Sequence, residues 1–369
     1  MTENQSFASR AGATLGLYAL AHGAVDAACA VLLWRAVHDG LVVAGTAFSA
    51  FLIYNLLAFA VQPVIGLAID HLGRARGAAA LGGLVTAAAL PLASAPRLFT
   101  VAVVVAGLGN ALFHVGGGVV SAAAAPGRAT TLGFFVAPGA AGLALGIVSG
   151  RAGDPVWPFA VALALLALVI AALPAPVLRM GGGSRPLPQA SRIEIVVLLL
   201  LFVVGVRSYA GMALALPWKS QMSLLTALTA AVVIGKALGG VLADRFGWRV
   251  IGVGALVISL PLLALGGGSP AAGIAGVLIF NMTMPVTLVA VIAALPRHTG
   301  FAFGLTCLAL FAGAAPVLAG WSPALSATLL VLLSGAAAVA LWFGLGELRD
   351  EDPPRDTVVA TQALEGGAA

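Results

Sequence analysis

The sequence predicts an all-α integral membrane protein with twelve transmembrane helices in two pseudo-symmetric six-helix bundles. Three observations support this. The chain is 61% hydrophobic and only 8% charged, whereas soluble domains carry about 25% charged residues. Its 369 residues divide into long apolar runs, and a spanning helix needs roughly 20 apolar residues. A polar loop sequence also occurs twice, at residues 66–76 and 240–249, each time between two such runs.

The apolar runs, taken in order, define the predicted spans and domains. Those of the first half lie at 11–35, 44–69, 77–95, 98–121, 129–150 and 156–178. Those of the second half lie at 193–216, 221–243, 249–267, 271–293, 300–320 and 323–346. A cytoplasmic linker rich in glycine and proline, 179–192, separates an N-terminal bundle (1–178) from a C-terminal bundle (193–346). The acidic, proline-containing tail at 347–369 is expected to be disordered in the cytoplasm.

Arginine and lysine in the loops predict the orientation, because cytoplasmic loops carry an excess of these residues. With the N-terminus inside, the inner segments hold Arg10, Arg74, Arg76, Arg128, Arg179, Arg185, Arg192, Arg245, Arg249, Arg297, Arg349 and Arg355. The outer segments hold Arg35, Arg97, Arg151 and Lys219. This bias predicts a multi-pass protein of the bacterial inner-membrane type, with both termini in the cytoplasm. It also accounts for the net charge of +5 without a nucleic-acid partner.

Other kinds of chemistry lack a sequence signature. Cys29 and Cys307 lie inside predicted spans, and no cysteine or histidine cluster has the spacing of a zinc site. No P-loop and no plausible Ser–His–Asp set is present. We therefore predict no metal, no cofactor and no enzymatic activity.

Ionisable side chains inside a membrane are costly, so each suggests a functional site. Tyr18, His22 and Asp26 recur every four residues and so share one face of the first span. Asp26 is the one carboxylate placed well inside the bilayer. Burial and mutual attraction act in opposite directions on the protonation of such a pair, so it can exchange a proton near neutral pH. We interpret His22 and Asp26 as the proton-coupling pair; the alternative is a polar pair that fixes a contact between helices.

Further polar residues within the spans are candidates for substrate binding: Tyr18, Asn55, Asn110, His114, Arg207 and Lys236. Asn110 and His114 share a face of the fourth span. Arg207 cannot shed its charge and must meet a carboxylate, a polar cavity or an anionic substrate. Lys236 either lines the site or extends toward the cytoplasm. These cations favour an anionic or zwitterionic substrate over a lipophilic cation, unless Arg207 pairs with Asp26.

The two loops resemble the signature G-x-x-x-D-(R/K)-x-G-(R/K) of the major facilitator superfamily, and Pro138-Gly139 resembles its antiporter motif. The resemblance implies two bundles around a central cavity that work by alternating access. It assigns gating to eight loop residues: Gly66, Asp70, Gly73, Arg74, Gly240, Asp244, Arg245 and Gly247. Asp70 is also expected to meet a helix N-terminus, where negative charge is favoured.

A narrower resemblance is to the fosmidomycin-resistance branch of drug exporters. It is carried by His22 with Asp26, by Gln62-Pro63 and by Phe113-His114, although the Pro-Glu that usually follows this histidine is absent. The resemblance implies a monomer that exports a small organic solute or drug by proton-coupled antiport. The partners expected are that solute, protons and the lipid bilayer. The alternatives are a uniporter or importer of the same fold, or a non-transporting membrane sensor.

Overall fold

In the computed structural model, helices and their short connections make up the described residues, which are 3–41, 44–174, 190–321 and 325–349. Eleven helical segments are long and apolar enough to cross a membrane, and Trp157–Ala172 is a shorter apolar helix. The all-α membrane class predicted from the sequence is therefore confirmed. Most of the predicted linker and tail lies outside the described residues.

Among the described residues, the first half of the chain holds five of these eleven segments and the shorter helix. Its helices are α1 (Glu3–His38), α2 (Ala44–Asn55), η1 (Leu56–Ala60), α3 (Gln62–Leu72), α4 (Ala75–Ala93), η2 (Pro96–Leu98), α5 (Phe99–Ala124), α6 (Ala129–Ala152) and α7 (Trp157–Ala172). Helix α1 begins eight residues before the predicted span (11 − 3 = 8), so the polar N-terminal segment continues the same helix.

The second half repeats this arrangement. Its helices are α8 (Ala190–Ala213), η3 (Pro217–Ser220), α9 (Met222–Phe246), α10 (Trp248–Leu265), α11 (Pro270–Asn281), α12 (Thr283–Ala294), α13 (Thr299–Leu318) and α14 (Ala327–Arg349). Helix α8 begins inside the predicted linker and α14 ends inside the predicted tail, so both predicted boundaries differ by a few residues from the observed helix ends.

Two spans are interrupted, which the apolar pattern does not predict. The second span passes from α2 through the π-helical turn η1 into α3, and Pro63 stands at the start of α3. The tenth span breaks between α11 and α12, just before Pro285. Proline lacks the N–H that would bond to the carbonyl four residues earlier, and its ring clashes with that carbonyl. The helix therefore rearranges one turn before Pro63 and one turn before Pro285.

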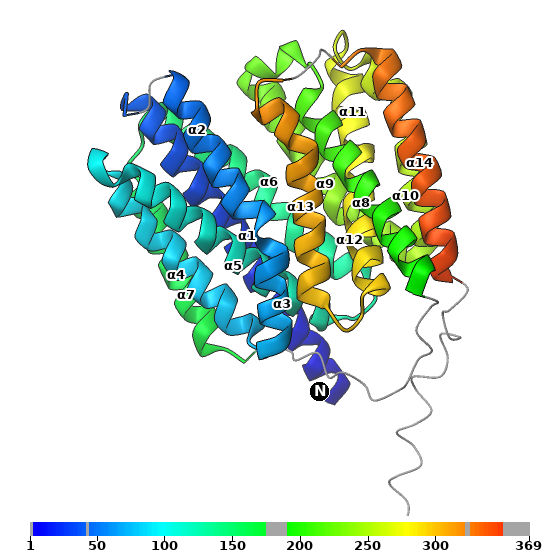
Figure 1. The fold of residues 1–369 in the computed structure, drawn as a ribbon, viewed down its shortest axis with the longest axis horizontal. Helices are drawn as coiled ribbons and strands as arrows, with labels where there is room; N and C mark the ends of the chain where they lie inside the picture. Colours follow the sequence, from blue (N-terminus) through cyan, green and yellow to red (C-terminus); the bar gives the residue numbers. More distant parts are fainter. Residues whose placement is uncertain (1–2, 42–43, 175–189, 322–324, 350–369) are drawn as a thin grey trace, which may run out of the picture.

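The helices form two groups in space, one from each half of the chain (Figure 1). Within the groups, α1 packs on α6, α4 packs on α5, and α8 packs on α13 and α14. Between the groups, α6 contacts α9 and α12, while α13 contacts α3, η1 and α5. The fifth and eleventh spans, together with the second and eighth spans that they contact, thus form the main interface between the two halves.

Glycines allow these helices to approach closely. A Cβ atom at Gly142 of α6 would overlap the carbonyl of Gly23 in α1, and one at Gly313 of α13 would overlap the carbonyl of Gly205 in α8. In lipid, packing between helices depends on this close contact because the hydrophobic effect does not drive them together. The glycine-rich face at residues 139–146 therefore holds α6 against α1.

Candidate functional site

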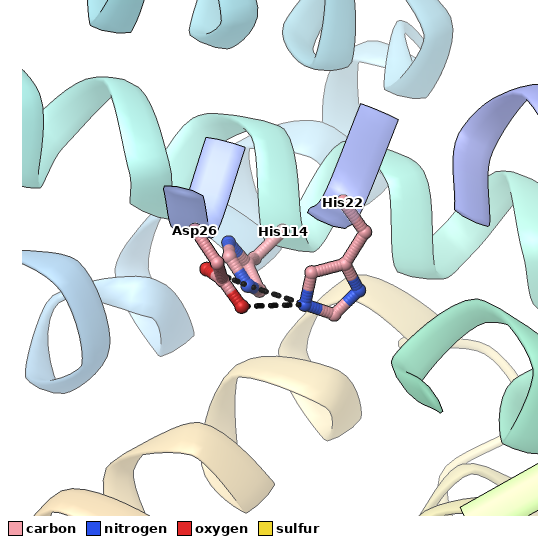
Figure 2. Close-up of side chains that lie close together, drawn as sticks. All are labelled: His22, Asp26 and His114. Atoms are coloured by element: carbon pink, nitrogen blue, oxygen red, sulfur yellow. Dashed lines mark hydrogen bonds and ion pairs between the residues drawn. The ribbon is translucent and has the colours of Figure 1, made fainter. Parts of the chain in front are cut away.

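The centre of the N-terminal group holds an acid–imidazole cluster, formed by His22 and Asp26 of α1 and His114 of α5 (Figure 2). Nε2 of His22 lies 3.3 Å from Oδ2 of Asp26. Nε2 of His114 lies 3.5 Å from Oδ1 of the same carboxylate. The two histidine side chains are 6% exposed and that of Asp26 is 19% exposed, so the carboxylate is the most accessible member.

Backbone carbonyls orient both imidazole rings. Nδ1 of His22 lies 2.8 Å from the carbonyl oxygen of Phe135 in α6. Nδ1 of His114 lies 2.9 Å from the carbonyl oxygen of Asn110, one turn earlier in α5. Since a carbonyl oxygen only accepts, both Nδ1 atoms donate and both Nε2 atoms turn toward the carboxylate. The Nε2 atoms are 2.9 Å apart.

Further polar groups lie beside the carboxylate on the side of α2 and α5. The amide nitrogen of Asn110 lies 3.5 Å from Oδ1 of Asp26 and donates to the hydroxyl of Tyr54 at 3.0 Å. The same nitrogen is 3.7 Å from the thiol of Cys29. Asn110 was predicted from the sequence as a site residue and Tyr54 was not, although a tyrosine beside Asn55 within an apolar run is a signal for it.

Helix α6 closes the other side of the cluster. A Cβ atom at Gly139 would lie 2.6 Å from both Oδ2 of Asp26 and Nε2 of His22. The ring of Phe135 packs against His22, with 4.7 Å between the ring centroids. The glycine of the antiporter-like sequence thus makes room for the ionisable pair, a role that the sequence resemblance did not suggest.

Two of the predicted substrate-binding residues stay apart from this cluster. Asn55 is half-buried, and its amide donates to the carbonyl of Phe51 in its own helix at 2.8 Å. Tyr18 is buried, and its hydroxyl has no hydrogen-bond partner within the described part of the chain. It lies one turn before His22 in α1 and would contact a Cβ atom at Gly117. The structure therefore brings His114 and Asn110 to the ionisable cluster and leaves Asn55 and Tyr18 outside it.

The two intramembrane cations come from the C-terminal group. Arg207 of α8 is 8% exposed, and its Nε has no hydrogen-bond partner among the described residues. No ion pair joins Arg207 to Asp26 in the described structure. The predicted alternative, a direct pair between these two residues, is therefore not what the structure contains.

Lys236 crosses from α9 to the other group. Its Nζ donates to the carbonyl oxygen of Val136 in α6 at 3.3 Å, and Val136 directly follows the residue that orients His22. Val136 lies about 10 Å along α6 from its first residue, at 1.5 Å per residue. Lys236 thus reaches sideways into the interface between the groups, and does not extend toward the loop side as the alternative interpretation proposed.

The aspartates of the two loop motifs make equivalent contacts. Asp70 accepts hydrogen bonds from the backbone N–H groups of Gly300 and Phe301, at 2.8 and 2.9 Å. These residues begin α13, in the other half of the chain. As sequence analysis expected, Asp70 meets a helix N-terminus, where its charge interacts favourably with the unpaired N–H groups.

Asp244 repeats this contact in the opposite direction. It accepts from the N–H groups of Ala129 and Thr130, both at 2.9 Å, and from the hydroxyl of Thr130 at 2.5 Å. Ala129 begins α6. Each half therefore caps the helix that the other half presents at the interface.

The loop glycines support these caps. A Cβ atom at Gly66 would overlap the backbone of Gly300, and one at Gly240 would lie 2.6 Å from the carbonyl oxygen of Ala129. Gly73 and Gly247 end their helices at positive φ angles of 64° and 98°, a region that favours glycine.

The loop arginines make weaker contacts. Arg74 lies at the start of α4 and is exposed, and the guanidinium of Arg245 lies 5.5 Å from the ring centroid of Phe246. The motif arginines thus do not contribute to the aspartate caps.

The cluster is also the group of side chains in the described structure that comes closest to a metal site. The ligand atoms of His22, Asp26 and His114 lie within 4.8 Å of one another. Two ligands held tetrahedrally at about 2.05 Å from zinc are about 3.3 Å apart. The separation of 2.9 Å between the Nε2 atoms is shorter than this and is a normal hydrogen-bond length. The geometry therefore fits a hydrogen between the rings better than a metal ion.

Comparisons with known proteins define the fold. No protein-family model and no curated protein matches the chain. A structure of FucP, a major facilitator superfamily transporter in the outward conformation, is 14% identical, with a TM-score of 0.61 over 90% of this chain and 99% of that chain. A variant of the fucose:proton symporter FucP from E. coli is 13% identical, with a TM-score of 0.62 over 90% and 96% of the two chains.

The nucleoside transporter NupG is similar to the same degree. It is 13% identical, with a TM-score of 0.56 over 92% of this chain and 100% of that chain. The chain therefore has the fold of the major facilitator superfamily transporters. The resemblance to the fosmidomycin-resistance branch stays a prediction.

Proposed function

We propose that this protein is a proton-coupled secondary transporter of a small zwitterionic or anionic solute, working by alternating access. One observation carries the proposal. One group of helices holds the carboxylate–imidazole cluster, and the other holds two cations, the buried Arg207 and the half-buried Lys236, that have no carboxylate partner among the described residues. Lys236 donates to the carbonyl of Val136, next to the residue whose carbonyl orients His22. Such charges are costly inside a membrane and mark ion or substrate pathways.

The cations determine the charge of the solute. Lys236 extends from α9 to the carbonyl of Val136 in α6, next to the residue that orients His22, and Arg207 is buried in α8 of the same group. Neither cation forms an ion pair within the described residues. A carboxylate, phosphonate or similar group of the solute would supply the counter-charge for these two side chains, because an arginine buried in a membrane needs one.

Whether the proton and the solute move in the same direction or in opposite directions depends on whether the solute also carries a cationic group. A purely anionic solute binds more tightly when the cluster holds a proton, and this linkage is reciprocal, so it leads to cotransport. A zwitterion can place its ammonium group at Asp26, where it competes with the proton and leads to exchange. Export by antiport, expected from the sequence, therefore goes with a zwitterionic solute, and import with an anionic one.

The paired aspartates supply the gate in this proposal. Asp70 and Asp244 each join one half to a helix N-terminus of the other half. Charged hydrogen bonds of this kind contribute about 1.5–3 kcal/mol. They would hold the cytoplasmic side closed in one state and release it in the other, which is the two-state change that alternating access requires.

The test uses purified protein in liposomes that contain a pH-sensitive dye. Small phosphonates, organic acids, amino acids and amphiphilic drugs are added under an imposed proton gradient. We expect solute-dependent proton movement that Asp26→Asn removes, while Asp154→Asn, which changes an exposed loop carboxylate, leaves it intact. Proton-driven flux that persists in Asp26→Asn refutes the coupling assignment. Solute flux without proton movement indicates a uniporter, and binding without flux indicates a sensor.

A further inference from the structure

The hydrogen-bond partners of His22 and His114 fix the hydrogens on their rings. Both Nδ1 atoms face carbonyl oxygens, of Phe135 and Asn110, and must each carry a hydrogen. The two Nε2 atoms face each other at 2.9 Å. Two lone pairs would repel at this distance, and two N–H groups would collide. One hydrogen between the Nε2 atoms satisfies both rings.

We propose that His22 and His114 share a single proton between their Nε2 atoms, with Asp26 as its counter-ion. Three hydrogens on four ring nitrogens give the pair a charge of +1, which the carboxylate balances. Asp26 places one oxygen 3.3 Å from Nε2 of His22 and the other 3.5 Å from Nε2 of His114. His114, expected from the sequence to bind substrate, thus becomes half of the proton site.

The surroundings of the pair contain few other charges. Asp26 is the acidic neighbour on the same helix, α1. Helix α5 adds the neutral amide of Asn110, and α2 adds the neutral hydroxyl of Tyr54 beyond it. Helix α6 contributes a carbonyl and a glycine, with no ionisable group in contact. Helix α9 contributes Lys236, whose Nζ donates to the carbonyl oxygen of Val136, one residue after Phe135.

These charges determine how many protons the cluster exchanges. With the shared proton, the two rings and Asp26 together are neutral. Without it they carry one negative charge, and the ammonium of Lys236 lies at the neighbouring backbone of α6. A second proton would leave a net positive charge opposite that ammonium and would require the two Nε2–H groups to separate. The cluster therefore alternates between one proton and none.

The proton's part in transport rests on the proposed function, whereas the shared proton itself can be tested without transport. The sample is protein labelled with ¹⁵N-histidine in lipid nanodiscs, with His38, His71 and His298 changed to glutamine so that only the two buried rings remain. At neutral pH we expect three N–H hydrogens on the four ring nitrogens and a ¹⁵N–¹⁵N coupling between the Nε2 atoms. Changing His114→Gln in addition should remove the coupling.

Two results would overturn the shared proton. One is a pair of neutral rings without coupling between their Nε2 atoms. The other is a stoichiometric amount of a transition metal in elemental analysis, together with the absence of the Nε2 hydrogen. Either result is read directly from the protein and does not depend on the choice of solute.

The role in transport is tested with His114→Gln in the native background. We expect proton-driven accumulation to fall by about 5- to 150-fold, the range of a typical coupling between sites. Solute exchange without a proton gradient is measured in the same vesicles and normalises this fall, so that only the loss of proton coupling is scored. The control His38→Gln changes an exposed histidine at the end of α1.

The two proposals fail in different ways. If Asp26→Asn abolishes coupling and His114→Gln leaves it unchanged, proton coupling stands and the shared proton is wrong. If the coupling between the Nε2 atoms is present but no solute moves protons, the shared proton stands and proton-coupled transport is wrong.

Discussion

Gly139→Ala tests whether the close approach of α6 positions the ionisable cluster. The new methyl carbon would lie 2.6 Å from both Oδ2 of Asp26 and Nε2 of His22, whereas ordinary contact begins at 3.4 Å. The difference, 3.4 − 2.6 = 0.8 Å, must be absorbed by the side chains or by α6. Because Nδ1 of His22 is hydrogen-bonded to the carbonyl oxygen of Phe135 in α6, a shift of this helix also strains that hydrogen bond.

The expected effect is large on coupling and small on stability. A misplacement of about 1 Å can reduce the rate of a reaction by about 100-fold, so we expect a fall of this size in proton-driven flux. Overpacking costs about 1–3 kcal/mol, and replacing glycine by alanine within a helix returns up to about 1 kcal/mol. The net loss in stability is therefore about 0–3 kcal/mol, and the protein should remain folded.

The assay compares proton-driven flux in liposomes with the thermal unfolding of the same preparation. Gly254→Ala is the matched control, because a Cβ atom there has no neighbour within 4 Å. Full proton-driven flux in Gly139→Ala would show that the cluster tolerates the methyl group, and would refute the argument from geometry. Equal loss in both variants would point to a general effect of alanine on these helices.

Two further predictions concern the gate and the cations. Asp70→Asn and Asp244→Asn each keep one acceptor oxygen but lose the charge. Each should shift the equilibrium between the two states by about 10-fold or more, because a charged hydrogen bond contributes about 1.5–3 kcal/mol. Spin-label distances across the cytoplasmic ends of α3 and α13 measure this shift, and an unchanged distance distribution in both variants would contradict the gating role. Arg207→Gln should weaken the binding of an anionic solute by about 30-fold or more, because truncating one partner of a buried charge pair costs about 2–5 kcal/mol. Lys236→Gln should weaken it in the same direction, and unchanged solute affinity in both variants, measured by calorimetry, would exclude these cations from the site.

The sequence by itself determined the features that depend on neighbouring residues. Apolar run length and loop charge gave the membrane class and the positions of the spans, because each span must satisfy its own backbone hydrogen bonds in lipid. Helical periodicity placed His22 and Asp26 one turn apart on one face, and the structure places them 3.3 Å apart. The repeated loops identified Asp70 and Asp244, whose equivalent contacts follow from the duplication.

Only the tertiary structure decided which distant helices meet. His114 joins the acid–imidazole pair because α5 packs beside α1, and Gly139 contacts it because α6 also packs on α1. The same packing turned Lys236 toward α6 and left Asn55 bonded within its own helix. A helix repeats every 3.6 residues, so its sequence shows which residues share a face. Which helix that face meets depends on close packing at small residues far apart in the chain, and no local pattern records it.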